Sequence, residues 1–358
     1  MAEKTGVLVV DDSAFMRKVI SQIINDSERF YVVATARDGN DALKTLEEHK
    51  REVQLVTLDI QMPGMDGLTC LRNIMEKHPR RVIMVSSLTT DGARETLQAL
   101  EYGAVDFIAK PGGAISLAFD QVGDQLLQIL ESATQCSMPK PGIIHRPPTK
   151  ELHPAVVAVP EKFTAYKGSL LLIAVASSTG GPKALASLIP QIPKDIPAAI
   201  LIVQHMPTTF TKLLADRLDR SCEIQVKEAE EGDQLKAGLC LIAPGGVHTE
   251  VTRDERIRLT KDPPIGGLRP CADVTFQTIA SVFGNRSLGV VLTGMGRDGT
   301  AGCRALRNRG CKILVESKET ALIYGMPKSV VENNLHDQTV PLDKMAAAIV
   351  ERLNRDYS

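Results

Sequence analysis

The sequence lacks a strong excess of charge of either sign. Its 42 lysine and arginine residues are matched by 43 aspartate and glutamate residues, which leaves a formal net charge of −1. A general nucleic-acid binder holds the phosphate backbone through a basic surface, so this balance argues against that class and predicts no nucleic-acid partner. No basic recognition helix is evident in the more basic second half, which also weakens a transcription-factor interpretation.

The sequence also lacks the cysteine spacing of a zinc site or a disulfide framework. Its seven cysteines are odd in number, scattered, and never form C-x-x-C. No uninterrupted apolar run approaches the roughly 18–20 residues that cross a bilayer. Charged residues at positions 3 and 4, followed by one short apolar strand, are unlike a signal peptide. We therefore expect reduced thiols, a cytoplasmic location and no direct membrane insertion.

A proline-rich stretch is predicted to separate two domains. Six prolines fall within residues 139–160, and proline fixes φ and removes a backbone donor, which excludes a helix or a central strand there. We assign a first domain to residues 5–131, a linker to 132–168 and a second domain to 169–356. Residues 1–130 hold 14 basic and 19 acidic side chains, whereas the rest hold 28 and 24. These opposite net charges favour docking of the two domains onto each other.

Both halves predict an α/β architecture, because apolar runs alternate with segments of helical period. In the first half the expected strands are residues 7–10, 31–34, 55–58, 82–85 and 107–109, and the expected helices lie near 14–25, 40–49, 66–77, 91–102 and 114–131. Five such units predict a flavodoxin-like parallel sheet with helices on both faces. In the second half the expected strands are 170–176, 198–203, 288–292 and 312–315, with a hairpin-like region at 224–260. This half is predicted to be a second doubly wound, mainly parallel domain.

Charged side chains are predicted to meet at one edge of the first sheet. Asp11 and Asp12 follow the first expected strand, Asp59 follows the third, Ser86 closes the fourth and Lys110 follows the fifth. Ligands bind at this edge of a doubly wound sheet, and clustered carboxylates favour a cation such as Mg²⁺ with oxygen ligands. A strand-end aspartate is often only a turn former or a helix cap. That alternative does not explain why four strands place such groups at the same edge.

Four segments that carry these residues resemble the response-regulator receiver domain: V-V-D-D-S at 9–13, T-L-D-I-Q-M-P-G-M-D-G at 57–67, M-V-S-S at 84–87 and D-F-I-A-K-P at 106–111. The resemblance implies that Asp59 accepts a phosphoryl group from an autophosphorylating histidine kinase. The chemistry is consistent, because a carboxylate nucleophile needs cations that neutralise the transferred group.

The resemblance also assigns roles to the residues around Asp59. The implied Mg²⁺ ligands are Asp12, Asp59 and the backbone carbonyl of Gln61, with Asp11 acting through water. The implied phosphoryl contacts are Ser86 and Lys110, and Phe107 matches the switch aromatic.

The second half carries A-S-S-T-G-G at 176–181, directly after an apolar strand. The two glycines allow a tight turn into a helix whose first N–H groups could hold an oxyanion, and a serine there becomes a nucleophile if a base reaches it. Two other interpretations stay open. Ser178 or Thr179 only caps the helix, or the segment binds phosphate, although G-x-x-x-x-G-K-[ST] and G-x-G-x-x-G are both absent.

His205 is the candidate base, because it ends the second expected strand of this half in V-Q-H-M-P at 203–207. Asp298, in L-T-G-M-G-R-D-G at 292–299, follows the strand at 288–292. Parallel strand ends converge on one edge, so serine, histidine and aspartate can meet there. The alternatives are a purely structural histidine and an aspartate that only caps the next helix. The order Ser, His, Asp and the lack of G-x-S-x-G distinguish this half from the α/β-hydrolases.

Together with the receiver segments ahead of them, these motifs resemble the chemotaxis protein-glutamate methylesterases of the CheB family. The resemblance implies phosphorylation-activated hydrolysis of γ-glutamyl methyl esters on the methylated cytoplasmic helices of chemoreceptors, with glutamine deamidation as a second activity. It implies Ser178 as the nucleophile, His205 as the base and Asp298 as the residue that orients the base. It also implies an oxyanion hole made by the backbone N–H groups near Thr179 and Met295, and no metal or other cofactor in this half.

Three departures from the family pattern bear on this site. Ala-Ser precedes Ser178 where the family has Gly-Ala, which makes Ser177 a rival nucleophile, although Ser178 aligns directly with S-T-G-G. Residues 268–274 read L-R-P-C-A-D-V in place of H-R-P-S-V-D-V, and Arg269 could position substrate. Arg297 replaces the common asparagine beside the candidate aspartate.

The competing function is a non-catalytic response regulator whose second half only binds a partner, and the retention of all three triad residue types argues against it.

Overall fold

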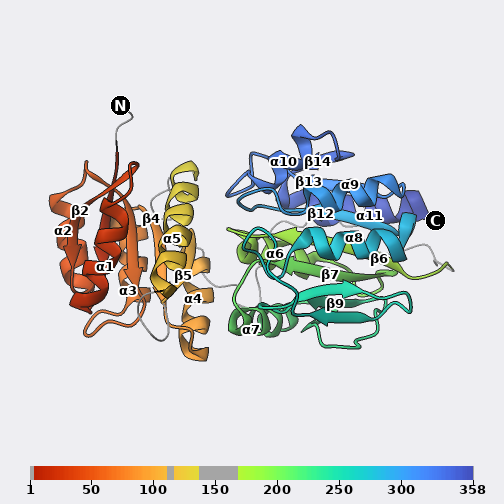
Figure 1. Ribbon diagram of the computed structural model, residues 1–358, viewed down its shortest axis with the longest axis horizontal. Helices are drawn as coiled ribbons and strands as arrows, with labels where there is room; N and C mark the ends of the chain where they lie inside the picture. Colours follow the sequence, from red (N-terminus) through yellow and green to blue (C-terminus); the bar gives the residue numbers. More distant parts are fainter. Residues whose placement is uncertain (1–3, 111–116, 137–167, 358) are drawn as a thin grey trace. The chain divides into compact units, whose positions relative to one another are not determined.

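The computed structural model describes residues 4–110, 117–136 and 168–357. The chain divides into two compact units, Met1–Leu152 and His153–Ser358, each with its own sheet (Figure 1). Of the predicted linker at 132–168, residues 137–167 lie outside the described ones. Within the described residues, no helix is both long enough and apolar enough to span a bilayer.

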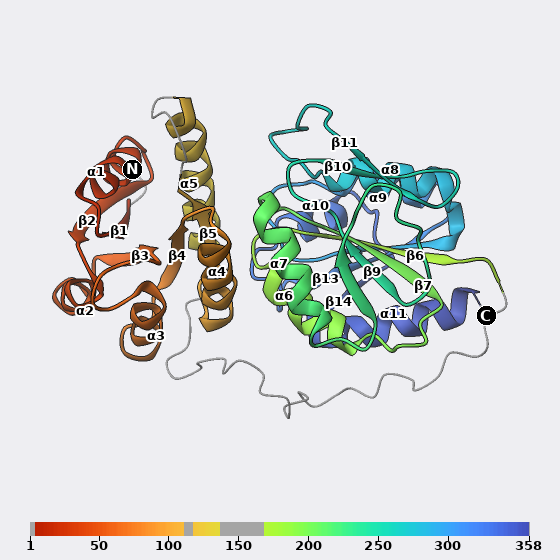
Figure 2. The same ribbon diagram turned by 90° about the horizontal axis from the view of Figure 1, so that it is seen from below.

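The first unit contains a five-stranded parallel sheet in the order β2-β1-β3-β4-β5. Its strands are β1 (Thr5–Val10), β2 (Phe30–Ala36), β3 (Val53–Asp59), β4 (Arg81–Ser86) and β5 (Asp106–Ala109). Its helices are α1 (Ala14–Asn25), α2 (Gly39–Glu48), α3 (Gly67–Lys77), α4 (Thr90–Tyr102) and α5 (Leu117–Gln135). Helices α1 and α5 cover one face of the sheet, and α2, α3 and α4 cover the other (Figure 2). The predicted flavodoxin-like arrangement is confirmed.

Local sequence explains where the elements of this unit begin. Four helices start at short polar side chains that accept a hydrogen bond from the N–H three residues later, namely Ser13, Asp38, Asp66 and Thr89. The central strand β3 is apolar because helices cover both of its faces, and all but one of its residues are buried. Asp59, at the end of β3, is therefore carried by a rigid, buried strand.

Helix α5 ends later than the sequence analysis predicts. The expected helix stopped at residue 131, but α5 continues to Gln135, so the first four residues of the predicted linker are helical. The cause is the apolar spacing of Leu126, Leu130 and Ala133, which continues the buried face of the helix for another turn. The guanidinium of Arg81 on β4 also donates a hydrogen bond of 2.8 Å to the carbonyl of Cys136, just past the helix end.

The second unit contains a seven-stranded parallel sheet in the order β14-β13-β12-β6-β7-β9-β8. Its strands are β6 (Leu171–Ser177), β7 (Ala198–Gln204), β8 (Gln225–Glu228), β9 (Leu239–Ile242), β12 (Ser287–Val291), β13 (Lys312–Glu316) and β14 (Gln338–Val340). Its α-helices are α6 (Gly181–Leu188), α7 (Thr208–Asp219), α8 (Ala272–Val282), α9 (Thr300–Asn308), α10 (Met326–Glu332) and α11 (Leu342–Tyr357), and η1 (Ile189–Gln191) and η2 (Gly284–Arg286) are short 3₁₀ helices. Helices α6, α7 and α11 cover one face, and α8, α9 and α10 the other (Figure 2). The predicted second doubly wound domain is confirmed.

The region at 224–260 is a hairpin only in its second part. β10 (His248–Val251) and β11 (Ile257–Thr260) pair in antiparallel fashion, as expected for a hairpin. β8 and β9 instead join the main sheet as parallel strands, so the expectation was wrong for them. The physical reason is visible in β9, whose last three residues are wholly buried, as in a strand covered on both faces.

The sheet of the second unit reverses its strand order at β6. The chain passes from β6 to β7 on one side, and β12 later pairs with β6 on the other side. Crevices for ligands form where a doubly wound sheet changes direction in this way, beyond the carboxyl ends of the strands. The ends of β6, β7 and β12 carry the serine and histidine motifs and the loop that leads to Asp298, so the topology brings all three to one edge.

Candidate active site

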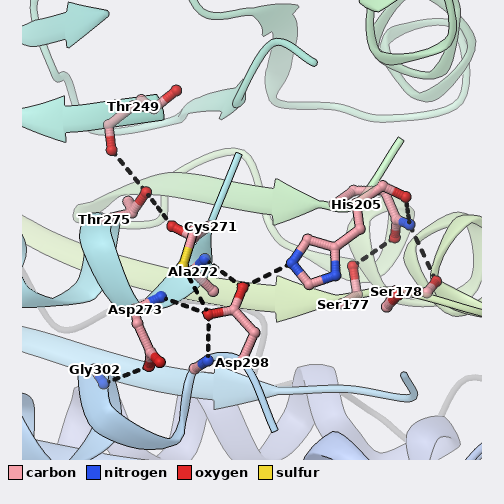
Figure 3. A network of polar contacts seen from close by, with 12 residues as sticks. Ser177, Ser178, His205, Thr249, Cys271, Ala272, Asp273, Thr275, Asp298 and Gly302 are labelled. Carbon is pink, nitrogen blue, oxygen red and sulfur yellow. Dashed lines mark hydrogen bonds and ion pairs between the residues drawn. The ribbon is translucent and has the colours of Figure 1, made fainter. Parts of the chain in front are cut away.

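The two serines at the end of β6 lie in different environments. Ser177 is fully buried, and its hydroxyl donates a hydrogen bond of 2.7 Å to Oε1 of Gln204 on β7. The amide nitrogen of Gln204 donates in turn to the carbonyl of Ser178 at 3.0 Å and to that of His205 at 3.2 Å (Figure 3). Ser178 itself is half-buried. The geometry therefore disfavours Ser177 as the nucleophile and leaves Ser178 as the accessible serine.

The turn after Ser178 depends on its glycines. Gly180 has φ of 79°, in the left-handed region, and it forms the N-cap of α6 without any side-chain cap. A Cβ on Gly181 would lie 1.9 Å from Oε1 of Gln204, so only glycine fits between the turn and that amide. Neither Ser178 nor Thr179 caps α6, and the capping interpretation of these two residues is wrong.

His205 and Asp298 form a buried pair across the strand ends. Nε2 of His205 lies 2.7 Å from Oδ2 of Asp298, and the two side chains are only 9% and 5% exposed. Burial raises the pKa of Asp298, but the hydrogen bond and charge of His205 and the nearby backbone N–H groups outweigh it and lower that pKa to about 2. Asp298 is therefore a fixed anion at neutral pH, able to stabilise an imidazolium.

The N-terminus of helix α8 supplies further donors to this carboxylate, in addition to the N–H of Gly299, which donates at 2.9 Å. The N–H groups of Ala272 and Asp273 donate to Asp298 at 2.6 and 2.9 Å, and the thiol of Cys271 lies 3.1 Å from Oδ1 (Figure 3). Burial, helped by the charge of Asp298, raises the pKa of Cys271 to about 12, so the thiol stays protonated as a donor. Cysteine stands here where the motif expected from the resemblance has serine, and both side chains can donate.

Helices α8 and α9 exchange acceptors at their N-termini. Asp298 precedes α9 but bonds the first N–H groups of α8, whereas Asp273 in α8 accepts from the N–H of Gly302 in α9 at 2.6 Å. A carboxylate at a helix N-terminus satisfies free donors and complements the helix dipole. The N-cap of α9 is Gly299, so the alternative interpretation, in which Asp298 only caps its own next helix, is wrong.

The imidazole of His205 lies between the Asp298 carboxylate and the two serines (Figure 3). Because Nε2 faces Asp298, Nδ1 is the nitrogen left to act as a base toward Ser178. Among the hydrogen bonds of these described residues, none joins the Ser178 hydroxyl to the ring. Such bonds are often long in enzymes without substrate and shorten in the substrate complex.

The two loops expected to form an oxyanion hole lie against each other. The N–H of Ser178 donates to the carbonyl of Thr293 at 3.0 Å, and a Cβ on Gly294 would lie 2.9 Å from Cβ of Ser178. The loop from β6 to α6, with Thr179, is therefore adjacent to the loop from β12 to α9, with Met295. Thr179 is buried and Met295 is half-buried.

Two arginines lie in the segments where this sequence departs from the family pattern, and their surroundings differ. Arg269 donates hydrogen bonds from Nη1 to the carbonyls of Asp262 and Lys261, at 3.1 and 3.3 Å, and so holds the loop before it. Arg297 is exposed and is not among the groups that bond the Asp298 carboxylate. Substrate positioning by Arg269 stays a prediction.

The carboxylate cluster of the first unit forms as expected. Asp11 and Asp59 are buried and Asp12 is exposed, and one oxygen from each lies within 4.8 Å of the others. Nζ of Lys110 lies 3.0 Å from Asp11 and 2.8 Å from Asp59. Burial raises the pKa of Asp59, Lys110 lowers it and Asp11 raises it, so the net shift is upward. This set of hard oxygen donors suits a hydrated Mg²⁺ ion.

The remaining receiver residues are placed around this cluster. The N–H of Gln61 donates to Oδ1 of Asp59 at 3.3 Å. The hydroxyl of Ser86 instead contacts α4, where it lies 3.1 Å from the carbonyl of Gly92 and accepts from Thr96 at 2.7 Å. Phe107 is buried. The phosphoryl-contact role of Ser86 and the switch role of Phe107 stay predictions.

Gln204 is a site residue that the sequence analysis missed. It bonds Ser177, Ser178 and the backbone of His205, and thereby joins the ends of β6 and β7. A signal was present, because Gln204 is the one polar residue that ends an otherwise apolar strand directly before the candidate histidine.

Comparisons with known proteins identify the family of each half of the chain. The CheB methylesterase family model matches residues 173–349, and the response regulator receiver domain model matches residues 7–118. A protein-glutamate methylesterase/protein-glutamine glutaminase of Pyrococcus horikoshii is 42% identical over 98% of this chain and 94% of its own length. A relative of the same name from Geobacillus kaustophilus is 44% identical over 96% of this chain and 97% of its own length.

A solved structure extends the likeness of the second unit. The crystal structure of the Thermotoga maritima CheB methylesterase catalytic domain is 41% identical with a TM-score of 0.50, and the match covers 51% of this chain and 99% of that one. The chain therefore belongs to the CheB methylesterase family, as a carboxylic ester hydrolase of the protein-glutamate methylesterase/protein-glutamine glutaminase type that carries a response-regulator receiver domain.

Proposed function

We propose that this protein hydrolyses γ-glutamyl methyl esters on the cytoplasmic helices of chemoreceptors through a Ser178, His205 and Asp298 triad, and that phosphorylation of Asp59 activates it. Glutamine deamidation on the same helices is the second reaction. The observation that carries the proposal is the buried 2.7 Å pair of His205 and Asp298 beside a half-buried Ser178. A cytoplasmic location follows from the position of the substrate helices.

In the first half of the reaction His205 acts as general base. Nδ1 takes the proton of the Ser178 hydroxyl while Nε2–H stays bonded to Asp298, and the serine oxygen attacks the ester carbonyl carbon. The tetrahedral intermediate collapses as the imidazolium returns the proton to the leaving methoxide. Methanol departs, and an acyl ester links the substrate glutamyl group to Ser178.

In the second half a water molecule replaces methanol. His205 removes a proton from the water, the resulting hydroxide attacks the acyl carbon, and the proton returns to the serine oxygen as it leaves. The products are a substrate glutamate and free Ser178. A glutamine side chain enters the same sequence and releases ammonia in place of methanol.

The negative oxygen of each tetrahedral intermediate needs hydrogen-bond donors. We assign this role to backbone N–H groups near Thr179 and Met295. The contact between their two loops supports the assignment, because donors from both sides can converge on one oxygen beside Ser178.

Asp59 is the proposed phosphoacceptor, and an autophosphorylating histidine kinase is the donor. Asp12, Asp59 and the Gln61 carbonyl would hold Mg²⁺, with Asp11 bonding through water. The ion would supply positive charge against the phosphoryl oxygens. Lys110, which already contacts Asp11 and Asp59, would supply a second positive charge. Ser86 would turn from α4 toward the phosphoryl group.

Control by the receiver is proposed to work by occlusion. The unphosphorylated receiver docks on the catalytic unit and blocks receptor access to Ser178, and phosphorylation with repacking of Phe107 weakens the docking. Two features of the sequence support this mechanism, the proline-rich segment at 139–160 and the opposite net charges of the two halves. A tethered partner acts at an effective concentration of roughly millimolar, so the docking contact can be weak.

The test is methanol release from methylated receptor with and without a small-molecule phosphodonor. Wild-type protein should release methanol faster with the donor. Ser178→Ala should release none, and Asp59→Asn should release it at the basal rate in both conditions. Persistent release by Ser178→Ala would refute the triad, and a full response in Asp59→Asn would refute phosphorylation of that residue.

A further inference from the structure

Thr293 connects the serine loop to the rest of the sheet. It lies two residues past the end of β12 and is 2% exposed. Its carbonyl accepts from the N–H of Ser178 at 3.0 Å, and its hydroxyl donates to the carbonyl of Thr179 at 2.9 Å. One threonine therefore contacts the backbone of both the proposed nucleophile and its neighbour in the proposed oxyanion hole.

The same residue is anchored on its other side. The hydroxyl of Thr293 accepts from the N–H of Ile323 at 2.9 Å, and the N–H of Thr293 donates to Oε2 of Glu316 at 2.8 Å. Ile323 also accepts, through its carbonyl, the N–H of Gly294, which leads to Met295. The loop from β12 to α9 is therefore tied to the loop before α10 and to the end of β13.

Glu316 takes over where the strand pairing ends. The pairing of β12 with β13 stops at Val291 and Val315. The next N–H on this side of the chain is that of Thr293, and it donates to the side-chain carboxylate of Glu316 in place of a strand carbonyl. Glu316 is fully buried, and burial raises its pKa, opposed by hydrogen bonds with the N–H of Thr293 and with the side chain of Thr320. Burying a carboxyl group is costly, so its position here indicates a demand for an acceptor at this point.

We propose that Thr293, anchored by Glu316, is a positioning residue of the esterase reaction. It fixes the backbone of Ser178 and Thr179 relative to the loop that carries Met295. Oxyanion donors must be preorganised, and a displacement of about 1 Å can cost on the order of a hundredfold in rate. This inference rests on the proposed function, because it presumes attack by Ser178.

The variants separate the hydroxyl from the bulk of the side chain. Thr293→Val keeps the shape and removes the hydroxyl, Thr293→Ser keeps the hydroxyl, and Glu316→Gln keeps an acceptor oxygen whereas Glu316→Met removes it. The control is Thr249→Val, because Thr249 is fully buried and its hydroxyl has no hydrogen-bond partner among the described residues. All variants are made in the full-length chain.

The expected result is a loss of kcat without a change of KM. Thr293→Val and Glu316→Met should lower kcat for methanol release by about tenfold to a hundredfold, with KM within about twofold of wild type. Thr293→Ser and Glu316→Gln should retain most of kcat, and Thr249→Val should match wild type. If the role of Thr293 were merely structural, its substitution would lower the melting temperature and the amount of active enzyme, but not kcat per active site. Titration of Ser178 with a serine-reactive phosphonate gives the concentration of active sites that this comparison needs.

Three results would overturn the inference: full kcat per active site in Thr293→Val, equal losses in Thr293→Ser and Thr293→Val, or a change confined to KM. If Thr293→Val does not fold, Glu316→Met against Glu316→Gln decides by the same criterion. Ser178→Ala in the same assay separates failure of the proposed function from failure of the positioning role of Thr293. Activity in Ser178→Ala refutes the proposed function, whereas an inactive Ser178→Ala beside a fully active Thr293→Val refutes the positioning role alone.

Discussion

Asp59 of the receiver, the last residue of β3, and Asp298 of the catalytic unit, in the loop after β12, are both buried aspartates at the carboxyl edge of a parallel sheet. Their pKa values nevertheless shift in opposite directions. Burial raises the pKa of each, but Asp298 ends at about 2 and Asp59 ends above its ordinary value. Asp298 accepts from three backbone N–H groups, a thiol and His205, with no other carboxylate among its bonded groups. Asp59 accepts one N–H and shares Lys110 with Asp11.

The comparison shows that the number of donors and the neighbouring charge decide the role that a buried aspartate can play. A carboxylate saturated with donors is a fixed anion that can orient a base. Asp59 has few donors, a second carboxylate close by and one lysine. Such a carboxylate has lone pairs without donors, and a cation or a covalent partner would stabilise it. The carboxyl edge of such a sheet is therefore suited to two different chemistries, and substitutions at each edge test that difference.

The largest expected effect concerns the catalytic edge. Ser178→Ala should reduce ester hydrolysis by about 10⁴–10⁶-fold, because the attacking oxygen is lost. Ser177→Ala is the matched control one residue away, and it should keep substantial activity because that hydroxyl only bonds Gln204. Methanol release from methylated receptor measures both. The reverse pattern, with Ser177→Ala inactive and Ser178→Ala active, would show that the assignment is wrong.

The next effect concerns the receiver edge. Phosphodonor should raise the activity of wild-type protein toward receptor by about tenfold, which corresponds to a shift of about 1.4 kcal/mol in the docking equilibrium. Deletion of residues 1–150 should also raise basal activity, because the proposed mechanism attributes the low basal rate to occlusion by the receiver. A truncated protein no faster than the unphosphorylated full chain would refute occlusion, and the receiver would then have to act by stimulation.

A smaller effect is expected at the exchange between helices α8 and α9. Asp273→Ala removes the acceptor of the Gly302 N–H and should lower kcat several-fold, because α8 then holds Asp298 less firmly. Asp273→Asn keeps an acceptor oxygen and should restore most of kcat. Steady-state kinetics with full-length protein, with active sites titrated, measure the difference. Equal kcat in both variants and wild type would show that the exchange serves stability alone.

The sequence predicts most of the residues that meet at the two sheet edges, for a physical reason. Apolar runs identify buried parallel strands, and a doubly wound sheet gathers whatever follows those strands, so Asp11, Asp59, Ser178 and His205 could be placed at two edges. The prediction for β8 and β9 is wrong because a strand's partner is not encoded in its own short pattern. The predicted end of α5 is wrong because a single buried apolar residue, Ala133, continues the helical period past residue 131.

The supporting contacts could not be predicted in the same way. The bond between Thr293 and Thr179 joins residues 114 positions apart, and the one between Asp273 and Gly302 joins residues 29 apart. Such contacts depend on side-chain reach across loops whose paths no local pattern specifies. The sequence therefore indicates which groups meet at an edge, and the structure is needed to show what holds them there.

The last expected effect is on stability rather than on rate, and it has opposite signs at the two aspartates. The pKa of Asp298 falls from 3.8 to about 2 on folding, so its ionised form stabilises the native state by about 2 kcal/mol above roughly pH 4, a contribution that is lost as pH falls toward 2. Asp298→Asn should therefore lower the melting temperature at pH 7, and the decrease should be smaller at pH 3.

Asp59 has a raised pKa, so its ionisation costs stability at neutral pH, and the neutral amide of Asp59→Asn should raise the melting temperature of the transition that involves the receiver. This gain should shrink below the ordinary aspartate pKa, where the carboxyl group is protonated in both the folded and unfolded states. Calorimetry of the full-length variants at pH 7 and at pH 3 measures both signs. If both substitutions destabilised the protein equally at pH 7, Lys110 would have to compensate Asp59 fully, and the contrast between an aspartate saturated with donors and one poised for a cation would not hold.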